Sequence, residues 1–284
     1  MGQIQPPLTP VPAHGALRRG LDAAAAEIKQ TLASPAWDAL KLQLVGEMAK
    51  ADFWTRPERF QTLARLALMD RVQAAASTAE SLRTRLAKGS GRAGQYSREL
   101  VARLALQLHM VTLGIQDAFD GAPVEVALMI EPALDAAGET QATRKWCAQV
   151  AAMYRAWADN RHMQLSEVSN ASDKALPILV ISGFGAHRLL TAEVGLHVLE
   201  QAEDGGRATA RVRMAVAPLG DLSQAKLESA LKDAFVRAAP SNSVIRRYRG
   251  EPSPLVRDAA GAWRTGKFDS VMGGDFDLIG ATQA

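Results

Sequence analysis

The sequence predicts an α+β protein in which an N-terminal helical bundle or hairpin precedes a compact domain with a mixed α/β sheet. Apolar residues of segment 16–115 recur at steps of three or four, as they do on one face of a helix. In segment 177–214 the apolar runs are short and bounded by glycine or an Asp-Gly step, which is typical of consecutive antiparallel strands with tight turns. Segment 207–216 alternates basic or polar residues with apolar ones, so one face of that strand should be buried.

The composition is that of a globular protein with two domains. The chain has 284 residues, of which 48% are hydrophobic, and this is enough for two cores. Its 33 Lys and Arg against 30 Asp and Glu leave a net charge of +3, an excess too small to indicate nucleic-acid binding by itself. The single cysteine, Cys147, excludes an intramolecular disulfide and a cysteine-rich zinc site.

The first 15 residues are rich in proline and contain neither an apolar core nor a leading basic region. They therefore match neither a signal peptide nor a membrane span. We expect residues 1–15 to form a disordered tail, and we expect the protein to be cytoplasmic.

Helix signals characterise segment 16–119, which we interpret as the helical domain. Ser34, followed by proline, is typical of a helix N-cap and first turn. A break in the helical pattern is expected at 50–57. The Asp-Gly-Ala-Pro turn at 120–123 marks the expected start of the second domain, 120–284.

The second domain should combine strands with helices around a central sheet. In chain order the expected elements are a strand at 124–130, a helix at 138–161, a strand at 163–168, the strands of 177–214 and a helix at 222–236. Asp221 is the expected N-cap of the last helix. Spacing predicts that the helix at 138–161 buries Trp146, Tyr154 and Trp157.

The strand at 207–216 carries three arginines that should share its polar face. They are Arg207, Arg211 and Arg213. A cationic sheet face of this kind could bind RNA phosphate. The alternative is a solvated face that nearby acids neutralise. Those acids would include Glu193, Glu200 and Glu203.

A second basic tract lies nearer the C-terminus. It comprises Arg246, Arg247, Tyr248 and Arg249, with Arg257, Arg264 and Lys267 beyond. Arginines around a tyrosine could bind RNA phosphate beside a stacked base. The alternative is a strand with a solvated basic face, and the sequence leaves both interpretations open.

No catalytic or metal-binding set emerges from residue types and spacing. Glu193 and His197 are four residues apart, with His187 nearby. In an extended segment they would lie well apart, and no third ligand is spaced to join them. We interpret the histidine as a structural one and expect neither a metal nor a cofactor.

Several short motifs occur in order along most of the chain. The helical domain holds Trp54-x-x-Pro57-Glu58-Arg59. Next come Met153-Tyr154-x-x-Trp157-Ala158, Ile181-Ser182-Gly183 and Glu193-x-Gly195-Leu196-His197. The closing segment holds Ile245-Arg246-Arg247-Tyr248, Arg257-Asp258, Thr265-Gly266 and Val271-x-x-Gly274-x-x-Asp277. In type, order and spacing these motifs resemble those of the bacterial-type peptide chain release factors, in the branch that reads UGA and UAA.

The resemblance implies a release-factor core but not a working release factor. Members of the family use a Gly-Gly-Gln loop, in which the glycines let the backbone approach the peptidyl-tRNA ester and the glutamine positions the attacking water. This sequence contains no Gly-Gly-Gln. Where the family inserts the domain with that loop, the chain runs from 217–220 directly into the helix expected at 222–236. We therefore expect no enzymatic activity.

The stop-codon-reading motif of the family is missing as well. Members place Ser-Pro-Phe shortly after the histidine that corresponds to His197, whereas a shortened acidic segment follows here. This degenerate loop is Glu200, Gln201, Ala202, Glu203 and Asp204. Acidic side chains repel RNA phosphate, so stop-codon reading is not expected.

Together these features predict a non-catalytic release-factor-like protein that acts in translation. Its partner would be the ribosome, through rRNA near the factor or A site, or a translation-linked protein. One alternative is a protein-interaction module without a ribosomal role. Another is a peptidyl-tRNA hydrolase that uses a Gly-Gly-Gln supplied by a partner. Neither DNA nor a membrane is an expected partner, and the sequence does not indicate an oligomeric state.

Overall fold

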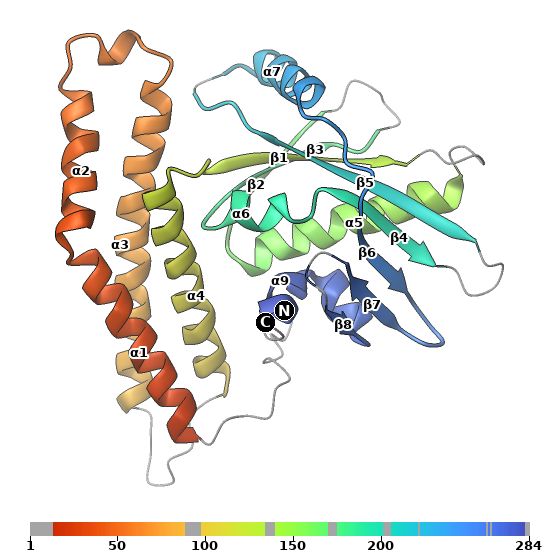
Figure 1. Cartoon of the computed structure of the whole chain (residues 1–284), viewed down its shortest axis with the longest axis horizontal. Helices are drawn as coiled ribbons and strands as arrows, with labels where there is room; N and C mark the ends of the chain where they lie inside the picture. Colours follow the sequence, from red (N-terminus) through yellow and green to blue (C-terminus); the bar gives the residue numbers. More distant parts are fainter. Residues whose placement is uncertain are drawn as a thin grey trace. The chain divides into compact units, whose positions relative to one another are not determined.

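A computed structural model describes residues 14–88, 98–133, 140–169, 175–200, 206–220, 222–259, 261 and 263–281. The protein is α+β, as predicted, with N-terminal helices followed by an eight-stranded mixed sheet and its helices (Figure 1). The chain divides into two compact units between Val124 and Glu125. Residues 1–13 of the expected tail lie outside the described residues, whereas His14 and Gly15 belong to the first helix.

The first unit is helical. Over its described residues the helices are α1 (His14–Leu32), α2 (Pro35–Met48), the 3-10 helix η1 (Phe53–Thr55), α3 (Arg59–Lys88) and α4 (Arg98–Asp120). The predicted break at 50–57 is confirmed, since α2 ends before it and α3 begins after it. Ser34 caps α2 as predicted, because its Oγ accepts a hydrogen bond from the backbone N–H of Trp37 at 3.2 Å.

The second unit is built on one sheet with the strand order β2-β3-β1-β5-β4-β6-β7-β8. Its strands are β1 (Glu125–Pro132), β2 (Gln164–Val168), β3 (Ile178–Ser182), β4 (Gly195–Glu200), β5 (Arg207–Val216), β6 (Val244–Arg249), β7 (Leu255–Asp258) and β8 (Arg264–Thr265). Neighbouring strands are antiparallel except β4 and β6, which are parallel.

The expectation of consecutive paired strands in segment 177–214 is wrong in part. Strands β4 and β5 form the predicted antiparallel pair, but β1 and β5 separate β3 from β4. The reason is a short helix, α6 (Ala186–Thr191), which occupies part of the segment that should have continued as a strand. Gly185, with a φ of 74°, directly precedes this helix. The side chain of Leu190, in the helix, is fully buried.

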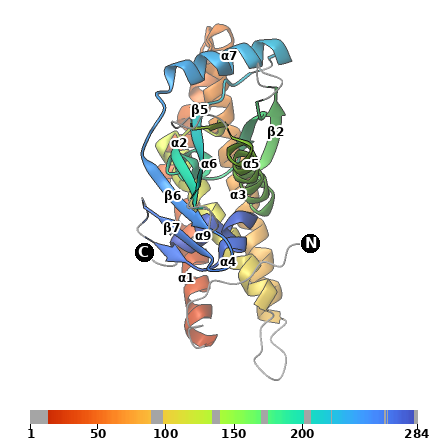
Figure 2. The same cartoon turned by 90° about the vertical axis from the view of Figure 1, so that its right-hand side faces the viewer.

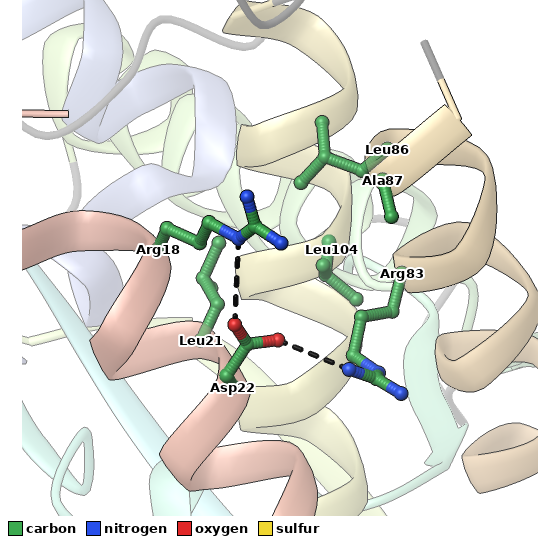
Figure 3. A pocket seen from close by; sticks show the side chains of 7 residues that line it. All are labelled: Arg18, Leu21, Asp22, Arg83, Leu86, Ala87 and Leu104. Atoms are coloured by element: carbon green, nitrogen blue, oxygen red, sulfur yellow. Dashed lines mark hydrogen bonds and ion pairs between the residues drawn. The ribbon is translucent and has the colours of Figure 1, made fainter. Parts of the chain in front are cut away.

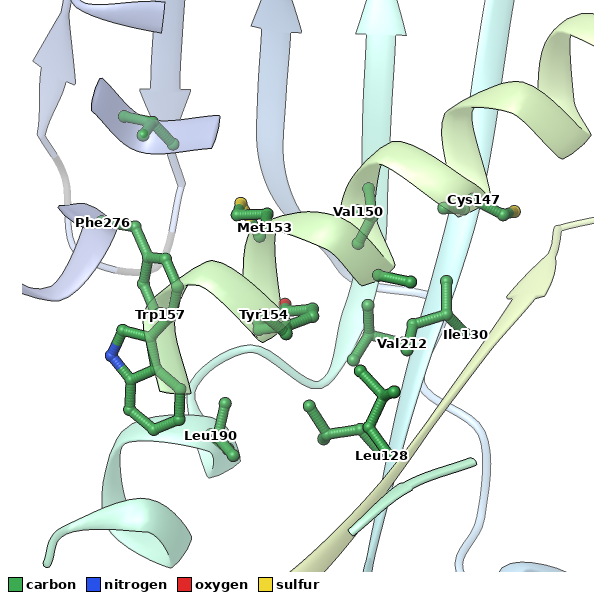
Figure 4. Packing of buried hydrophobic residues seen from close by; sticks show 14 of the residues in the cluster. Leu128, Ile130, Cys147, Val150, Met153, Tyr154, Trp157, Leu190, Val212 and Phe276 are labelled. Atoms are coloured by element: carbon green, nitrogen blue, oxygen red, sulfur yellow. The ribbon is translucent and has the colours of Figure 1, made fainter. Parts of the chain in front are cut away.

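Helix α5 (Gln141–Asn160) packs against one face of the sheet (Figures 1 and 2). The buried side of α5 is the predicted one, since Trp146, Tyr154 and Trp157 are all fully buried. Figure 4 shows Val150, Met153 and Tyr154 of α5 among Leu128 and Val212 of the sheet. The apolar face of this one helix therefore forms the centre of the unit's main core.

Helix α7 (Gln224–Arg237) packs on the opposite face of the sheet. Its buried Leu231 and Phe235 join Ala127 and Ala215 in a second, smaller core. The expected cap, Asp221, lies outside the described residues. The residue that directly precedes the helix is Ser223, and its side chain makes no capping hydrogen bond.

The C-terminal segment packs against α5. It consists of α8 (Phe268–Ser270), the π-helical turn η2 (Val271–Asp275) and α9 (Phe276–Ala281). Gly274 has a φ of 95°, and a Cβ at this position would lie 2.4 Å from the backbone N of Trp157. Only glycine fits here, because both the backbone conformation and the space exclude a side chain.

Replacing Gly274 with alanine should lower the free energy of unfolding by on the order of 3 kcal/mol, because left-handed backbone strain adds to a clash with α5. Urea unfolding followed by tryptophan fluorescence measures this change. Gly273→Ala is the matched control, since nothing lies within 4 Å of a Cβ at Gly273. The control should change stability by less than about 0.5 kcal/mol. Equal effects of the two substitutions would contradict the role given to the close approach.

Candidate functional site

A buried ionic cluster lies between the sheet and α5, centred on Arg246 of β6. The Arg246 side chain is 2% exposed, and it lies between the carboxylates of Glu193 and Asp258, each 5% exposed. Its Nη2 donates to Glu193 Oε1 at 2.7 Å and to Asp258 Oδ2 at 2.7 Å, while Nη1 donates to Glu193 Oε2 at 3.0 Å. One guanidinium thereby satisfies two carboxylates from separate segments of the chain.

Two tyrosines extend this cluster. The Tyr154 hydroxyl of α5 donates to Glu193 Oε2 at 3.0 Å, and the Tyr248 hydroxyl lies 3.4 Å from Arg246 Nη1. Both tyrosines are fully buried. Burial raises the pKa of Glu193, and the adjacent Arg246 charge opposes that change. The charged groups and hydroxyls of the cluster therefore have hydrogen-bonding partners inside the core, as buried charges require.

His197 of β4 completes the cluster, and its contacts define its protonation. Its Nε2 lies 3.1 Å from the carbonyl oxygen of Glu193, which can only accept, so Nε2 carries the proton. Its Nδ1 then accepts from the Tyr248 hydroxyl at 2.9 Å. Burial, aided by the Arg246 charge, lowers the pKa of His197 to about 3, in agreement with a neutral ring. The prediction of a structural histidine is confirmed, but the prediction that it lies well apart from Glu193 is wrong.

The residues of this cluster belong to separate motifs of the resemblance described above. Tyr154, Glu193, His197, Arg246, Tyr248 and Asp258 come from four stretches of sequence and meet in one place. Two further motif residues have the same kind of role. Gly274 packs on α5, and Asp277 forms a 2.6 Å ion pair with Arg161 next to the end of α5. These motif residues therefore belong to the core of the second unit.

Two residues of this cluster were predicted to bind RNA, and for both the prediction is wrong. Arg246 and Tyr248 are buried, so RNA in solvent cannot reach either of them. Along β6 the side chains alternate, and Arg247 and Arg249 lie on the opposite face of the sheet. The expectation that Glu193 neutralises the arginines of β5 is also wrong, because this carboxylate pairs with Arg246.

Arg213 of β5 has a structural role that the sequence did not indicate. Its Nη2 donates to the carbonyl oxygen of Ala238 at 2.8 Å and also to that of Phe235. These carbonyl groups lie at the C-terminal end of α7, where a cation is favourable. Arg213 therefore holds α7 on the sheet. Its guanidinium binds backbone carbonyl groups, so the predicted contact of Arg213 with RNA is not supported.

The remaining arginines form an open surface that we call the arginine face. It comprises Arg207, Arg211, Arg247, Arg249 and Arg257. Strand pairing places them on one face, because the face of β5 that carries Arg207 and Arg211 continues through Val198 and Glu200 of β4 to Arg247 and Arg249 of β6. Arg257 of β7 is the direct neighbour of Arg247.

Two acids lie beside the arginine face. Glu131 is 3.5 Å from the guanidinium of Arg211, and Glu200 is 3.7 Å from that of Arg247. Partly exposed ion pairs at these separations are weak and salt-sensitive. Glu200 is the only residue of the predicted degenerate loop in the described part of the chain. Gln201, Ala202, Glu203 and Asp204 lie outside it.

Besides the ionic cluster and the arginine face, the described residues contain a small pocket. A pocket in the helical unit is lined by Arg18, Leu21, Asp22, Arg83, Leu86, Ala87 and Leu104 (Figure 3). Its volume of about 30 Å³ is far below that of a ligand site. Asp22 lies between Arg18 and Arg83 there, at 3.6 and 3.1 Å. Within the described ranges no group of three or more His, Cys, Asp or Glu residues is placed to hold a metal ion, and no helix is long and apolar enough to cross a membrane.

No protein-family model matches the chain, and no curated protein matches it. Among solved structures, the chain is similar to RF2 of Thermus thermophilus with a TM-score of 0.41 and 15% sequence identity. That similarity covers 90% of this chain and 97% of the RF2 chain.

Replacing Arg246 with methionine should lower the free energy of unfolding by about 3–5 kcal/mol, because it leaves two carboxylates buried without a counter-charge. Arg247→Met is the matched control on the same strand. The side chain of Arg247 is 41% exposed, so its loss should cost less than about 0.5 kcal/mol. Urea unfolding of both variants distinguishes the two positions, and similar losses would contradict the burial argument.

The stability of the protein should fall as the pH drops from about 6.5 toward about 3. The unfolded chain takes up a proton at His197 in this interval, whereas the folded chain does not. One such group contributes about 1.4 kcal/mol per pH unit, so roughly 2.5 kcal/mol should be lost between about pH 6 and 4.

The variant His197→Gln isolates this contribution, because glutamine does not take up a proton. Any contribution of Glu193 to the pH dependence of stability is present in both proteins. Thermal or urea unfolding across the pH range should show a shallower acid slope for the variant. Parallel slopes in the two proteins would show that His197 does not titrate as stated.

Proposed function

We propose that this chain is a release-factor-like protein that acts in translation by binding the ribosome, without reading a stop codon or hydrolysing peptidyl-tRNA. One observation carries the proposal. Residues of four of the motifs that make the sequence resemble release factors meet in a single buried cluster around Arg246, and this supports a common core as the origin of the resemblance. Residues of this kind fold a domain and do not perform chemistry.

The segment between β5 and β6 supports the absence of hydrolysis. The family places its Gly-Gly-Gln domain there, whereas this chain has α7 packed on the sheet through Leu231 and Phe235. Arg213 holds the C-terminal end of α7 in place. A helix fixed in this way supplies neither a flexible glycine loop nor a glutamine that could position water at an ester.

The arginine face supports a ribosomal partner. Its guanidinium groups project from the sheet on the side opposite α5, and rRNA offers a dense array of phosphates. Only Glu131 and Glu200 form ion pairs with it among the described residues. Binding would then rest on phosphate contacts in the cytoplasm and would be sensitive to salt.

Ribosome binding should appear as co-sedimentation of the purified chain through a sucrose cushion at about 50 mM salt. If four arginines contact phosphate, affinity should fall roughly a hundredfold between about 50 and 200 mM salt. Recovery of the chain only in the supernatant at the lower salt concentration would overturn the ribosomal role.

Catalysis is tested on ribosomes that carry peptidyl-tRNA and a stop codon in the A site. The purified chain should release no peptide above the spontaneous rate. Release by the chain alone would overturn the non-enzymatic proposal, and release only with an added partner would support a hydrolase that recruits its Gly-Gly-Gln loop.

A protein partner is the second candidate, and exposed apolar side chains of the helical unit favour it. Leu42 is 72% exposed, and Trp54 is 60% exposed. Affinity capture with and without nuclease separates the two functions. Partners retained after nuclease treatment would support a protein-interaction role, whereas their loss would support a partner held through RNA.

A further inference from the structure

The arginine face has a regular layout that follows from the sheet. Arg247 and Arg257 are paired on neighbouring strands, so their Cα atoms are about 5 Å apart. Arg249 lies two residues farther along β6, at roughly 7 Å. Across β4, Arg207 and Arg211 continue the same surface. The cations therefore form a two-dimensional array rather than a single point of charge.

Aromatic side chains are missing from this surface. In the described strands β4 to β8 the one tyrosine, Tyr248, is fully buried on the opposite face. Trp263, which directly precedes β8, is also buried, and its ring lies 5.0 Å from the Arg246 guanidinium in the core. The surface can contact phosphate groups but has no tyrosine or tryptophan on which an unpaired base could stack.

The arginine face also retains charge that the described residues do not neutralise. Arg257 is exposed, and no acidic group among the described residues pairs with it. The pairs of Arg211 with Glu131 and of Arg247 with Glu200 are longer than 3.4 Å, whereas the buried Arg246 pairs are at 2.7 Å. Incoming phosphate can therefore compete for these guanidinium groups at little cost.

We propose that the arginine face binds the sugar-phosphate backbone of base-paired RNA without reading its sequence. This inference rests on the proposed ribosomal function and specifies the surface and the form of RNA. Proteins that bind single strands combine cations with aromatic stacking platforms, and this surface has only the cations. Double-stranded RNA is bound through its shape and backbone, which suits an array of guanidinium groups.

The first test compares two fluorescein-labelled RNAs by fluorescence anisotropy at low salt. One is a hairpin with a stem of about 16 base pairs, and the other is an unstructured single strand with the same number of phosphates. We expect the hairpin to bind at least tenfold more tightly, and changing the stem sequence should alter affinity less than twofold. Equal or tighter binding of the single strand would overturn the inference.

The second test removes charge from the face. The double variant Arg247→Gln, Arg257→Gln should weaken hairpin binding at least tenfold and should reduce the salt slope by about two. The matched control is Arg144→Gln, Lys145→Gln, which removes the same charge from exposed positions of α5, on the other side of the sheet. The control should stay within twofold of the unmodified chain. Unchanged hairpin affinity of the arginine variant would overturn the assignment.

Unfolding midpoints show whether the arginine variant remains folded, and both substituted side chains lie at the surface. Co-sedimentation of the same variants with ribosomes separates this inference from the proposed function. If the unmodified chain and the arginine variant sediment with ribosomes to the same extent, the ribosomal role stands, but the arginine face is not the surface that contacts the ribosome. If the hairpin binds as expected but the chain does not sediment, the face stands and the ribosomal role fails.

Discussion

The guanidinium of Arg246 joins three parts of the second unit that are distant in sequence. It ties β6 to Asp258 at the end of β7 and to Glu193 in the turn before β4. Tyr154 brings α5 into the same set of hydrogen bonds. Because each of these groups is buried, removing Arg246 leaves two carboxylates in the core without a counter-charge. The identities of these residues are therefore set by one another, and this accounts for why polar residues occupy the centre of an apolar core.

This interdependence also explains what the release-factor-like motifs represent. By residue type Glu193 and His197 could belong to a metal site, but the side-chain oxygen and nitrogen atoms of both residues bond to partners inside the core. The motif residues in the cluster consequently stabilise the fold of the second unit. The side chains of the arginine face are, by contrast, at least partly exposed to solvent, and the proposed binding rests on them.

Local patterns in the sequence predicted the elements that local patterns control. The spacing of Trp146, Tyr154 and Trp157 predicted the buried side of α5, and Ser34 predicted the start of α2. The order of the strands was not predictable in this way, because α6 interrupts an apolar run that looks like a strand. The period of two predicted for β5 is confirmed over its first part, since Ala208, Ala210 and Val212 are buried and the alternating Arg207 and Arg211 are not.

The same reasoning failed for Arg246 because its partners are 12 and 53 residues away in sequence. A signal was present, since Arg246 shares a strand face with Tyr248, and a tyrosine two residues away favours the buried face. Electron cryomicroscopy of the chain bound to ribosomes tests the separation of core and binding surface most directly. The account predicts an rRNA helix against the arginine face, with α5 turned away from it. Contact with rRNA through the α5 side of the sheet would contradict it.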